Sequence, residues 1–258
     1  MLCNDIMKII ESTYPKHAAL EWDNVGLLVG RTEKEVKTIY IALDATDEVI
    51  DLAIANKADL LITHHPMLFS PLKKITDEHF IGSRVVKLLQ HDISYYAMHT
   101  NYDVLGMAGL SGALLGLEKM DVLEVTDEEN QEGIGRVGEL SEPMTLKECC
   151  DFVKAKFELS GVKVFGDLAA TIKRVAISPG SGKHMSELAI KKGADVFVTA
   201  EIDHHEGIDS VAQGLAIIDA GHYGLEHIFV SDIARFLQEK TEGVKIVTAD
   251  IEHPFQFV

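Results

Sequence analysis

The stretch that decides the fold occurs twice, as LAIANKADLLITHH at residues 52–65 and as LAIKKGADVFVTAE at residues 188–201. Each copy has the pattern of a helix end, a turn and a buried strand, and each follows a strand-like segment. Any helix–turn–strand unit shares part of this pattern, whereas an internal duplication would explain the gapless match. We favour the duplication. The identical pairs are Leu52/Leu188, Ala53/Ala189, Ile54/Ile190, Ala58/Ala194, Asp59/Asp195 and Thr63/Thr199.

Helical and extended patterns alternate along the rest of the chain. The segment 47–57 is typical of a helix between the strands 37–46 and 58–63, and Thr145 with Glu148 forms the sequence signature of a capping box. Such alternation predicts an α/β protein with parallel or mixed sheets.

We expect two similar α/β lobes, residues 1–126 and 127–258, divided near the acidic stretch TDEENQEG. We expect the segment around 219–230 to return ligands to a metal site that the lobes share.

Composition narrows the range of partners. The formal net charge is −17, and no cluster of lysine or arginine interrupts it, so we expect no nucleic-acid partner. No apolar run approaches the ~20 residues that span a bilayer, so we expect no membrane partner. The three cysteines show no C-x-x-C spacing and are interpreted as reduced thiols of a cytoplasmic protein.

Two adjacent histidines, His64 and His65, follow the apolar run Leu60–Ile62 and precede Pro66. Ligands of α/β proteins bind where strands end, which makes both imidazoles candidate metal ligands. Successive residues of an extended chain point to opposite sides, so the pair is not expected to chelate one ion together. Either each histidine holds a different ion of a close pair, or one is a ligand and the other belongs to the core.

Two further strand ends carry similar groups. His99 and Asp103 follow the strand-like SYYAM, and His222 and Glu226 are four residues apart, a spacing that places two side chains on one helix face. Nitrogen and oxygen ligands without thiolates suit Zn, Mn, Fe or Co, and two ions ~3.5–4 Å apart are typical of hydrolases. The candidate metal ligands are His64, His65, Asp103, His222 and Glu226.

These motifs also resemble a known family. In order and spacing, EWDNVGLLVG, ALDAT, ITHHPMLF, HTNYD, GIGRVGEL, SPGSG, VTAE and DAGHYGLEH are similar to the Nif-three-like family, the GTP cyclohydrolase 1 type 2 homologs. The resemblance implies two α/β lobes with a dinuclear metal site in the cleft between them, the same five ligands, and ring-shaped homohexamers. It also implies a small-molecule substrate such as GTP, whose purine ring would be opened by metal-activated water.

In that reaction Glu226 would bridge the two ions, and His99 is the candidate proton shuttle. His99 is equally well interpreted as a structural histidine or as the partner that orients Asp103. The alternative function is a non-enzymatic metal-binding, metal-delivery or regulatory protein, because such a protein needs the same ligands.

The remaining polar motifs are interpreted more simply. His204 and His205 are expected to be solvated, while a place for Glu201 in the site is left open. The stretch SPGSGKH lacks the spacing of a phosphate-binding loop, although its glycine turn before a helix has the features of a weaker phosphate site. The residues Trp22, Asp23 and Asn24 are expected to form a turn packed on the first lobe.

Overall fold

The computed structural model describes residues 1–256 and divides into two compact units. Unit 1 contains Met1–Tyr102 and His227–Glu252. Unit 2 contains Asp103–Glu226 and the tail that begins at His253. The chain passes between the units at Tyr102–Asp103, at Glu226–His227 and at Glu252–His253.

This grouping differs from the expected lobes 1–126 and 127–258, for reasons of strand pairing. Strand β5 (Glu118–Asp127) pairs with β6 (Glu132–Thr145), so the segment before residue 126 belongs with unit 2. Strand β11 (Lys245–Thr248) pairs with β2 (Thr38–Ala42), so residues near the C-terminus belong with unit 1. The α/β class is confirmed.

Unit 1 is built on a five-stranded sheet in the order β1-β4-β3-β2-β11. Strands β2, β3, β4 and β11 run parallel, and the edge strand β1 is antiparallel to β4. The three strands not yet given bounds are β1 (Gly26–Val29), β3 (Leu60–Thr63) and β4 (Ser94–Ala97).

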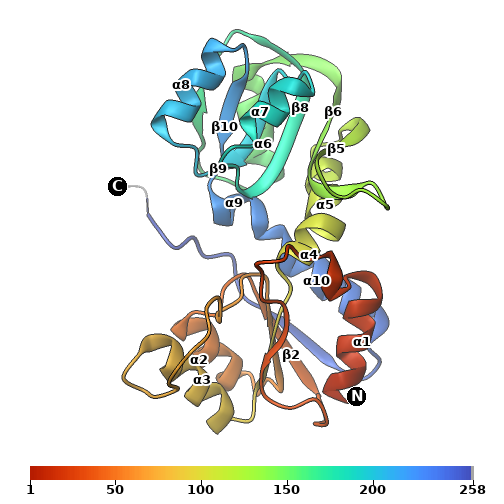
Figure 1. Cartoon of the computed structure of the whole chain (residues 1–258), viewed down its shortest axis with the longest axis vertical. Helices are drawn as coiled ribbons and strands as arrows, with labels where there is room; N and C mark the ends of the chain where they lie inside the picture. The colour runs from red at the N-terminus through yellow and green to blue at the C-terminus, as the bar shows by residue number, and fades with distance from the viewer. Residues whose placement is uncertain (257–258) are drawn as a thin grey trace. The chain divides into compact units, whose positions relative to one another are not determined.

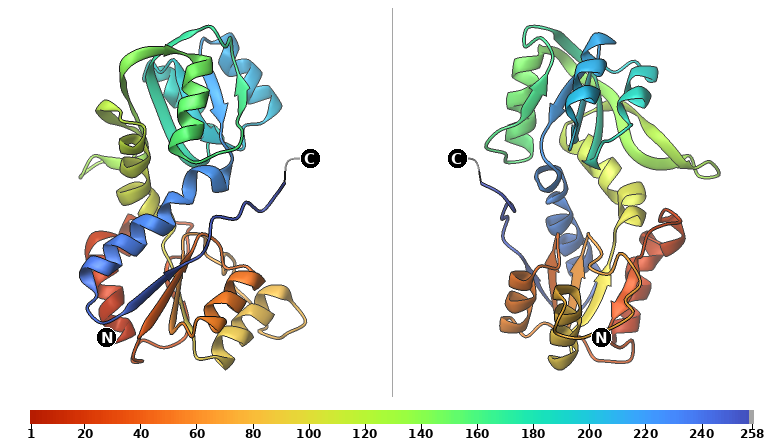
Figure 2. Two further views of the ribbon diagram at one scale, coloured as in Figure 1. Left: turned by 180° about the vertical axis from the view of Figure 1, so that it is seen from behind. Right: turned by 60° about the vertical axis from the view of Figure 1, so that its left-hand side comes forward.

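Helices cover both faces of this sheet (Figures 1 and 2). On one face lie α2 (Asp47–Ala55) and α3 (Phe80–Gln90), and on the other α1 (Cys3–Thr13) and α10 (Ile228–Lys240). The hydroxyl of Thr46 accepts a hydrogen bond from Val49 N and so caps α2.

Unit 2 has a six-stranded mixed sheet in the order β5-β6-β8-β9-β10-β7. Helix α6 (Leu146–Lys156) covers one face, while α7 (Ser186–Lys191) and α8 (His204–Ala212) cover the other (Figure 2). The predicted capping box of Thr145 and Glu148 is present at the start of α6. The remaining elements are β7 (Lys163–Phe165), β8 (Thr171–Ser181), β9 (Val196–Ala200), β10 (Ala216–Asp219), α5 (Ala108–Leu114) and α9 (His222–Glu226).

The two units repeat one topology. In each, an antiparallel edge strand is followed by three parallel strands, giving β1-β4-β3-β2 in unit 1 and β7-β10-β9-β8 in unit 2. Leu60 and Val196 are at matching positions of the two copies, and their partners Ile39 and Val175 precede them by the same number of residues in each unit. The shared register supports the internal duplication.

The shared aspartates occupy the same place in each unit. Asp59 Oδ2 accepts hydrogen bonds from Lys37 N and Thr38 N at 2.7 and 3.0 Å. Asp195 Oδ2 accepts from Lys173 N and Arg174 N at 2.9 and 2.7 Å. Each carboxylate therefore satisfies two backbone donors of the preceding strand segment, at the start of β2 in unit 1 and within β8 in unit 2.

The described residues 1–256 include no helix long and apolar enough to cross a membrane. Cys3, Cys149 and Cys150 are buried and form no disulfide. Burial raises the pKa of the Cys149 thiol to about 12, which makes it a packing residue rather than a nucleophile.

Candidate metal centre

Three histidines gather at the carboxyl ends of β3 and β4 in unit 1. The possible ligand atoms of His64, His65 and His99 all lie within 4.8 Å of one another. The ring centroids of His64 and His65 are 4.9 Å apart. The two rings are close although they come from successive residues, because β3 ends at Thr63 and strict alternation does not extend beyond the strand.

The hydrogen bonds of both neighbouring histidines favour metal binding. His64 is fully buried, and its Nδ1 lies 2.8 Å from the Met98 carbonyl oxygen. His65 Nδ1 lies 2.8 Å from Asp44 Oδ1. An imidazole that donates through Nδ1 carries its lone pair on Nε2, and such outer partners orient metal-bound histidines. Both rings therefore present Nε2 as the ligand atom.

His99 is held by a carboxylate that the sequence analysis missed. Asp23 Oδ1 lies 2.9 Å from His99 Nδ1, and Asp23 Oδ2 accepts from Thr100 N at 2.9 Å and from Thr100 Oγ1 at 2.6 Å. Burial alone would raise the pKa of Asp23, but the hydrogen bonds from His99 and Thr100 outweigh it and lower the pKa to about 2. Asp23 is therefore a stable carboxylate partner for His99.

Two exposed aromatic rings border this cluster. Trp22 is 58% exposed and Phe69 53% exposed, and their rings stack with centroids 5.8 Å apart. The His99 ring meets both of them edge-on. Beside Phe69, a pocket of about 370 Å³ runs from Asn24 to Ile75. Trp22 lies in the expected turn, and its ring forms part of an exposed aromatic surface.

Unit 2 positions the other predicted ligands. His222 is the first residue of α9 and Glu226 the last, and His222 Nε2 lies 3.0 Å from Glu226 Oε2. His222 Nδ1 lies 3.1 Å from Glu201 Oε1, which places Glu201 beside the predicted ligands. Asp103 is half-buried at the start of a π-helical turn, Asp103–Met107. Each of the three predicted ligands offers an atom to a group able to hold a metal ion.

A glycine of β8 makes room for the buried carboxylate. Glu226 is 2% exposed, and a Cβ on Gly180 would lie 2.6 Å from Glu226 Oε1. Gly180 also has a φ of +78°, a conformation that side chains disfavour. Gly180, in the SPGSG stretch at the end of β8, therefore leaves the space that the Glu226 carboxylate occupies.

The start of α7 is already occupied by a protein carboxylate. Glu206 Oε1 accepts hydrogen bonds from His184 N at 3.0 Å and from Ser186 Oγ at 2.7 Å. An added phosphate there would meet this negative charge, which argues against the phosphate site considered for SPGSGKH. His204 and His205 are exposed on α8.

The site partners Asp23 and Asp44 carry little signal in the sequence, whereas Glu201 was already a candidate. Each aspartate is a single acidic residue in a turn or at a strand end, far along the chain from the histidine it contacts. Only the strand pairing that brings these segments together identifies them.

Comparison with known proteins places this chain in a family. Residues 1–254 match the Duf34/NIF3 (NGG1p interacting factor 3) family, and the chain belongs to that family. It is 35% identical to the "GTP cyclohydrolase 1 type 2 homolog" of Clostridium perfringens, with all of both chains covered. It is 39% identical to the protein of that name from Clostridium acetobutylicum, over 86% of this chain and 84% of the relative.

A solved structure of the same family has a similar fold. The Bacillus cereus protein related to NIF3 superimposes with a TM-score of 0.94 at 28% sequence identity, covering 100% of this chain and 99% of that chain. The family resemblance drawn from the motifs is confirmed.

Proposed function

We propose that this chain is a hydrolase that uses two divalent metal ions and acts on a purine nucleotide. The observation that carries the proposal is the cluster of His64, His65 and His99, whose ligand atoms lie within 4.8 Å of one another. The name of the relatives, GTP cyclohydrolase 1 type 2 homolog, supports GTP as the first substrate to test. The reaction would add one water at C8 and open the imidazole ring to a formamide, and a second water would hydrolyse that formamide and release C8 as formate.

The donor set fits such ions. His64 and His65 would bind through Nε2, since Nδ1 of each ring is hydrogen-bonded to an oxygen acceptor. Asp103, His222 and Glu226 would add carboxylate oxygen and a further imidazole. A set of nitrogen and oxygen atoms without thiolates suits Zn, Mn, Fe or Co. When bound, the ions would act as Lewis acids and lower the pKa of water.

Chain connectivity supports a common role for the ligands of the two units. Asp103 directly follows Tyr102, and Glu226 precedes Phe229 by three residues. Within unit 1, the rings of Tyr102 and Phe229 are 5.0 Å apart, and the His64 ring lies 5.2 Å from Phe229. Two of the three covalent connections between the units therefore carry a predicted ligand and lead to the residues that pack on His64.

His99 and the exposed rings provide the remaining functions. Asp23 fixes the His99 ring through Nδ1, so Nε2 is the atom that would transfer a proton to or from the substrate. The stacked Trp22 and Phe69 rings offer a flat apolar surface on which a purine would stack. Asp23 is thus a positioning residue, and Trp22 binds the base.

Metal content tests the ligand assignment. We expect His65→Ala and Glu226→Ala each to lower the metal bound by the purified protein to one ion or none per chain, measured by elemental analysis. His205→Ala, which removes an exposed histidine of α8, is the matched control and is expected to retain both ions. Full retention in both ligand variants would show that the ligands are wrong.

Turnover tests the reaction. Formate release from GTP is expected to require metal and to stop with chelator, and Trp22, the single tryptophan of the chain, is expected to report GTP binding by quenched fluorescence. Two bound ions without turnover of any nucleotide would favour the alternative, a metal-binding or metal-delivery protein.

We also propose a homohexamer, on the basis of the family resemblance. Light scattering of the metal-loaded protein measures its molar mass and so tests whether the chain forms a hexamer.

A further inference from the structure

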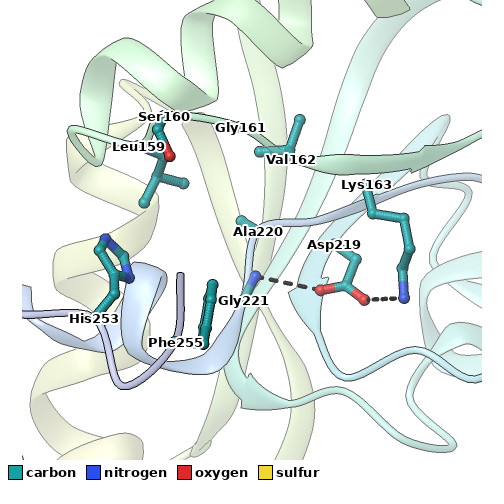
Figure 3. A pocket seen from close by; sticks show the side chains of 10 residues that line it. All are labelled: Leu159, Ser160, Gly161, Val162, Lys163, Asp219, Ala220, Gly221, His253 and Phe255. Carbon is teal, nitrogen blue, oxygen red and sulfur yellow. Dashed lines mark hydrogen bonds and ion pairs between the residues drawn. The ribbon is translucent and has the colours of Figure 1, made fainter. Parts of the chain in front are cut away.

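Unit 2 contains a cavity of about 470 Å³ at the carboxyl end of β10 (Figure 3). The segment 159–163, the residues 219–221 and two residues of the C-terminal tail, His253 and Phe255, line it. None of the five predicted metal ligands is among its lining residues. A volume of this size accommodates a small organic ligand, and carboxyl ends of parallel strands are where α/β proteins bind ligands.

The internal duplication shows which residues of unit 1 correspond to the residues that line this cavity. Lys163 pairs with Asp219 across β7 and β10, as Gly26 pairs with Ala97 across β1 and β4. Ala220 N donates to the Thr199 carbonyl, as Met98 N donates to that of Thr63. Counting outward from these pairs, residues 159–161 of unit 2 correspond to 22–24 of unit 1, and 221 corresponds to 99.

Smaller side chains at these matched positions explain the open space. In unit 1, Trp22 meets His99 edge-on and Asp23 is hydrogen-bonded to it, so side chains fill the corner. In unit 2 the residue that corresponds to His99 is Gly221, which has no side chain. Leu159 and Ser160 replace the larger Trp22 and Asp23. The same corner of the fold is therefore a cavity in unit 2.

The two ends of the cavity differ in chemistry (Figure 3). At one end, the His253 and Phe255 rings lie 5.7 Å apart between centroids. At the other, the Asp219 side chain is 9% exposed and pairs with Lys163 Nζ at 2.7 Å. Asp219 also accepts a hydrogen bond from Gly221 N at 3.2 Å. Lys163 balances the charge of Asp219, so the cavity suits a neutral ligand. The two rings suit a flat apolar face on that ligand, and the Asp219 carboxylate suits an N–H donor.

We propose that this cavity is a second small-molecule site, which binds a neutral nucleobase ring stacked on Phe255 with its amino group directed to Asp219. A carboxylate oxygen is a strong acceptor for such amino groups. Aromatic side chains stack on any nucleobase, because every base has a flat π-face. The site depends on neither the metal ions nor the proposed hydrolysis.

The test uses saturation-transfer NMR on the full chain with adenosine, guanosine and cytidine as probes and ribose as the non-aromatic control. We expect transfer to the base protons and none to ribose. In a Trp22→Ala background, which removes the base-stacking surface proposed for unit 1, Gly161→Leu should abolish the transfer by filling the cavity, because a Cβ at Gly161 meets nothing within 4 Å. Phe255→Ala, which removes a half-exposed ring of the tail, should weaken binding at least tenfold without unfolding the protein.

Trp22→Ala separates this site from the exposed ring surface of unit 1. Transfer that persists in Trp22→Ala and disappears in a folded Gly161→Leu variant supports the cavity. In the Trp22→Ala background, transfer that persists in a folded Gly161→Leu variant or at full strength in Phe255→Ala, or that none of the three nucleosides shows, overturns the proposal. Should Gly161→Leu fail to fold, judged by its urea midpoint, Phe255→Ala alone decides.

Discussion

The two units share a scaffold and differ at the ends of their strands. In unit 1, His64 and His65 come after Thr63, the last residue of β3, whereas in unit 2 the matching Thr199 is followed by Ala200, the last residue of β9, and by Glu201. The surroundings of the two matched threonines differ as well. Thr63 Oγ1 lies 2.8 Å from Tyr95 Oη, whereas Thr199 Oγ1 is buried with no hydrogen-bond partner among residues 1–256. The scaffold sets where side chains leave the sheet, and single substitutions there decide their chemistry.

The connection after this strand shows a second difference. In unit 1 a long segment runs from Thr63 to the start of α3 at Phe80, while in unit 2 only Glu201–Asp203 separate β9 from α8. The longer segment of unit 1 supplies Phe69, which stacks on Trp22. The aromatic surface beside the histidines therefore comes from an insertion that unit 2 lacks.

The largest effect is expected on metal affinity, from the substitution of one of two unit 2 glycines. Gly180 and Gly193 both have a positive φ, but they have different neighbours. Gly180→Ala places a Cβ 2.6 Å from Glu226 Oε1, so this carboxylate must move, and we expect metal affinity to fall roughly 10–100-fold. Gly193→Ala has a similar positive φ, +71°, but its Cβ meets nothing within 4 Å. Elemental analysis and metal titration should therefore show metal loss only in Gly180→Ala, while both variants lose similar stability. Equal metal affinity in the two would remove Glu226 from the site.

The shared aspartates test whether the duplicated scaffold is stabilised equally in both units. Asp59→Ala and Asp195→Ala each leave two backbone N–H groups without their carboxylate acceptor, and we expect each to cost about 2–3 kcal/mol. Urea unfolding followed by circular dichroism measures both losses. A loss in one unit at least twice that in the other would show that the two aspartates have diverged in role.

The sequence predicted the scaffold well because its signals are local and repeated. The helix–turn–strand repeat ending at Thr63 and Thr199, and the capping box at Thr145, depend on neighbouring residues, and both are present. The spacing of His222 and Glu226 also predicted their contact, since a helix fixes it.

Long-range features could not be predicted in the same way. The pairing of Asp23 with His99 joins residues far apart in sequence, and neither residue alone indicates the other. The same holds for β11, whose pairing with β2 carries the end of the chain back to unit 1. A short strand gives no information in sequence about which strand it pairs with.

The pH dependence of folding stability should differ between the two matched places, because Asp23 in unit 1 is replaced by Ser160 at the cavity of unit 2. Hydrogen bonds to His99 and Thr100 outweigh burial and lower the pKa of Asp23 to about 2, so folding favours its charged form. This contribution is fully present above the unfolded pKa near 4 and is lost as pH falls through 2, and it amounts to about 2 kcal/mol. Urea midpoints of wild type and Asp23→Asn, measured between pH 2 and 6, should converge toward low pH. A constant difference between the two would mean that Asp23 stabilises the fold by shape alone.

The smallest effect concerns one turn that the two units build with different residues. Lys57 in unit 1 and Gly193 in unit 2 occupy matching positions, with φ of +56° and +71°. A left-handed conformation costs a residue with a side chain about 1–2 kcal/mol, and glycine avoids this cost. Glycine also raises the entropy of the unfolded chain, which offsets part of the gain. We therefore expect Lys57→Gly to stabilise the protein, and Gly193→Lys to destabilise it, by about 0.5–1 kcal/mol each. Thermal unfolding of the two variants measures both changes. Shifts of the same sign would show that the surroundings of this turn, rather than its backbone conformation, decide which residue each unit carries.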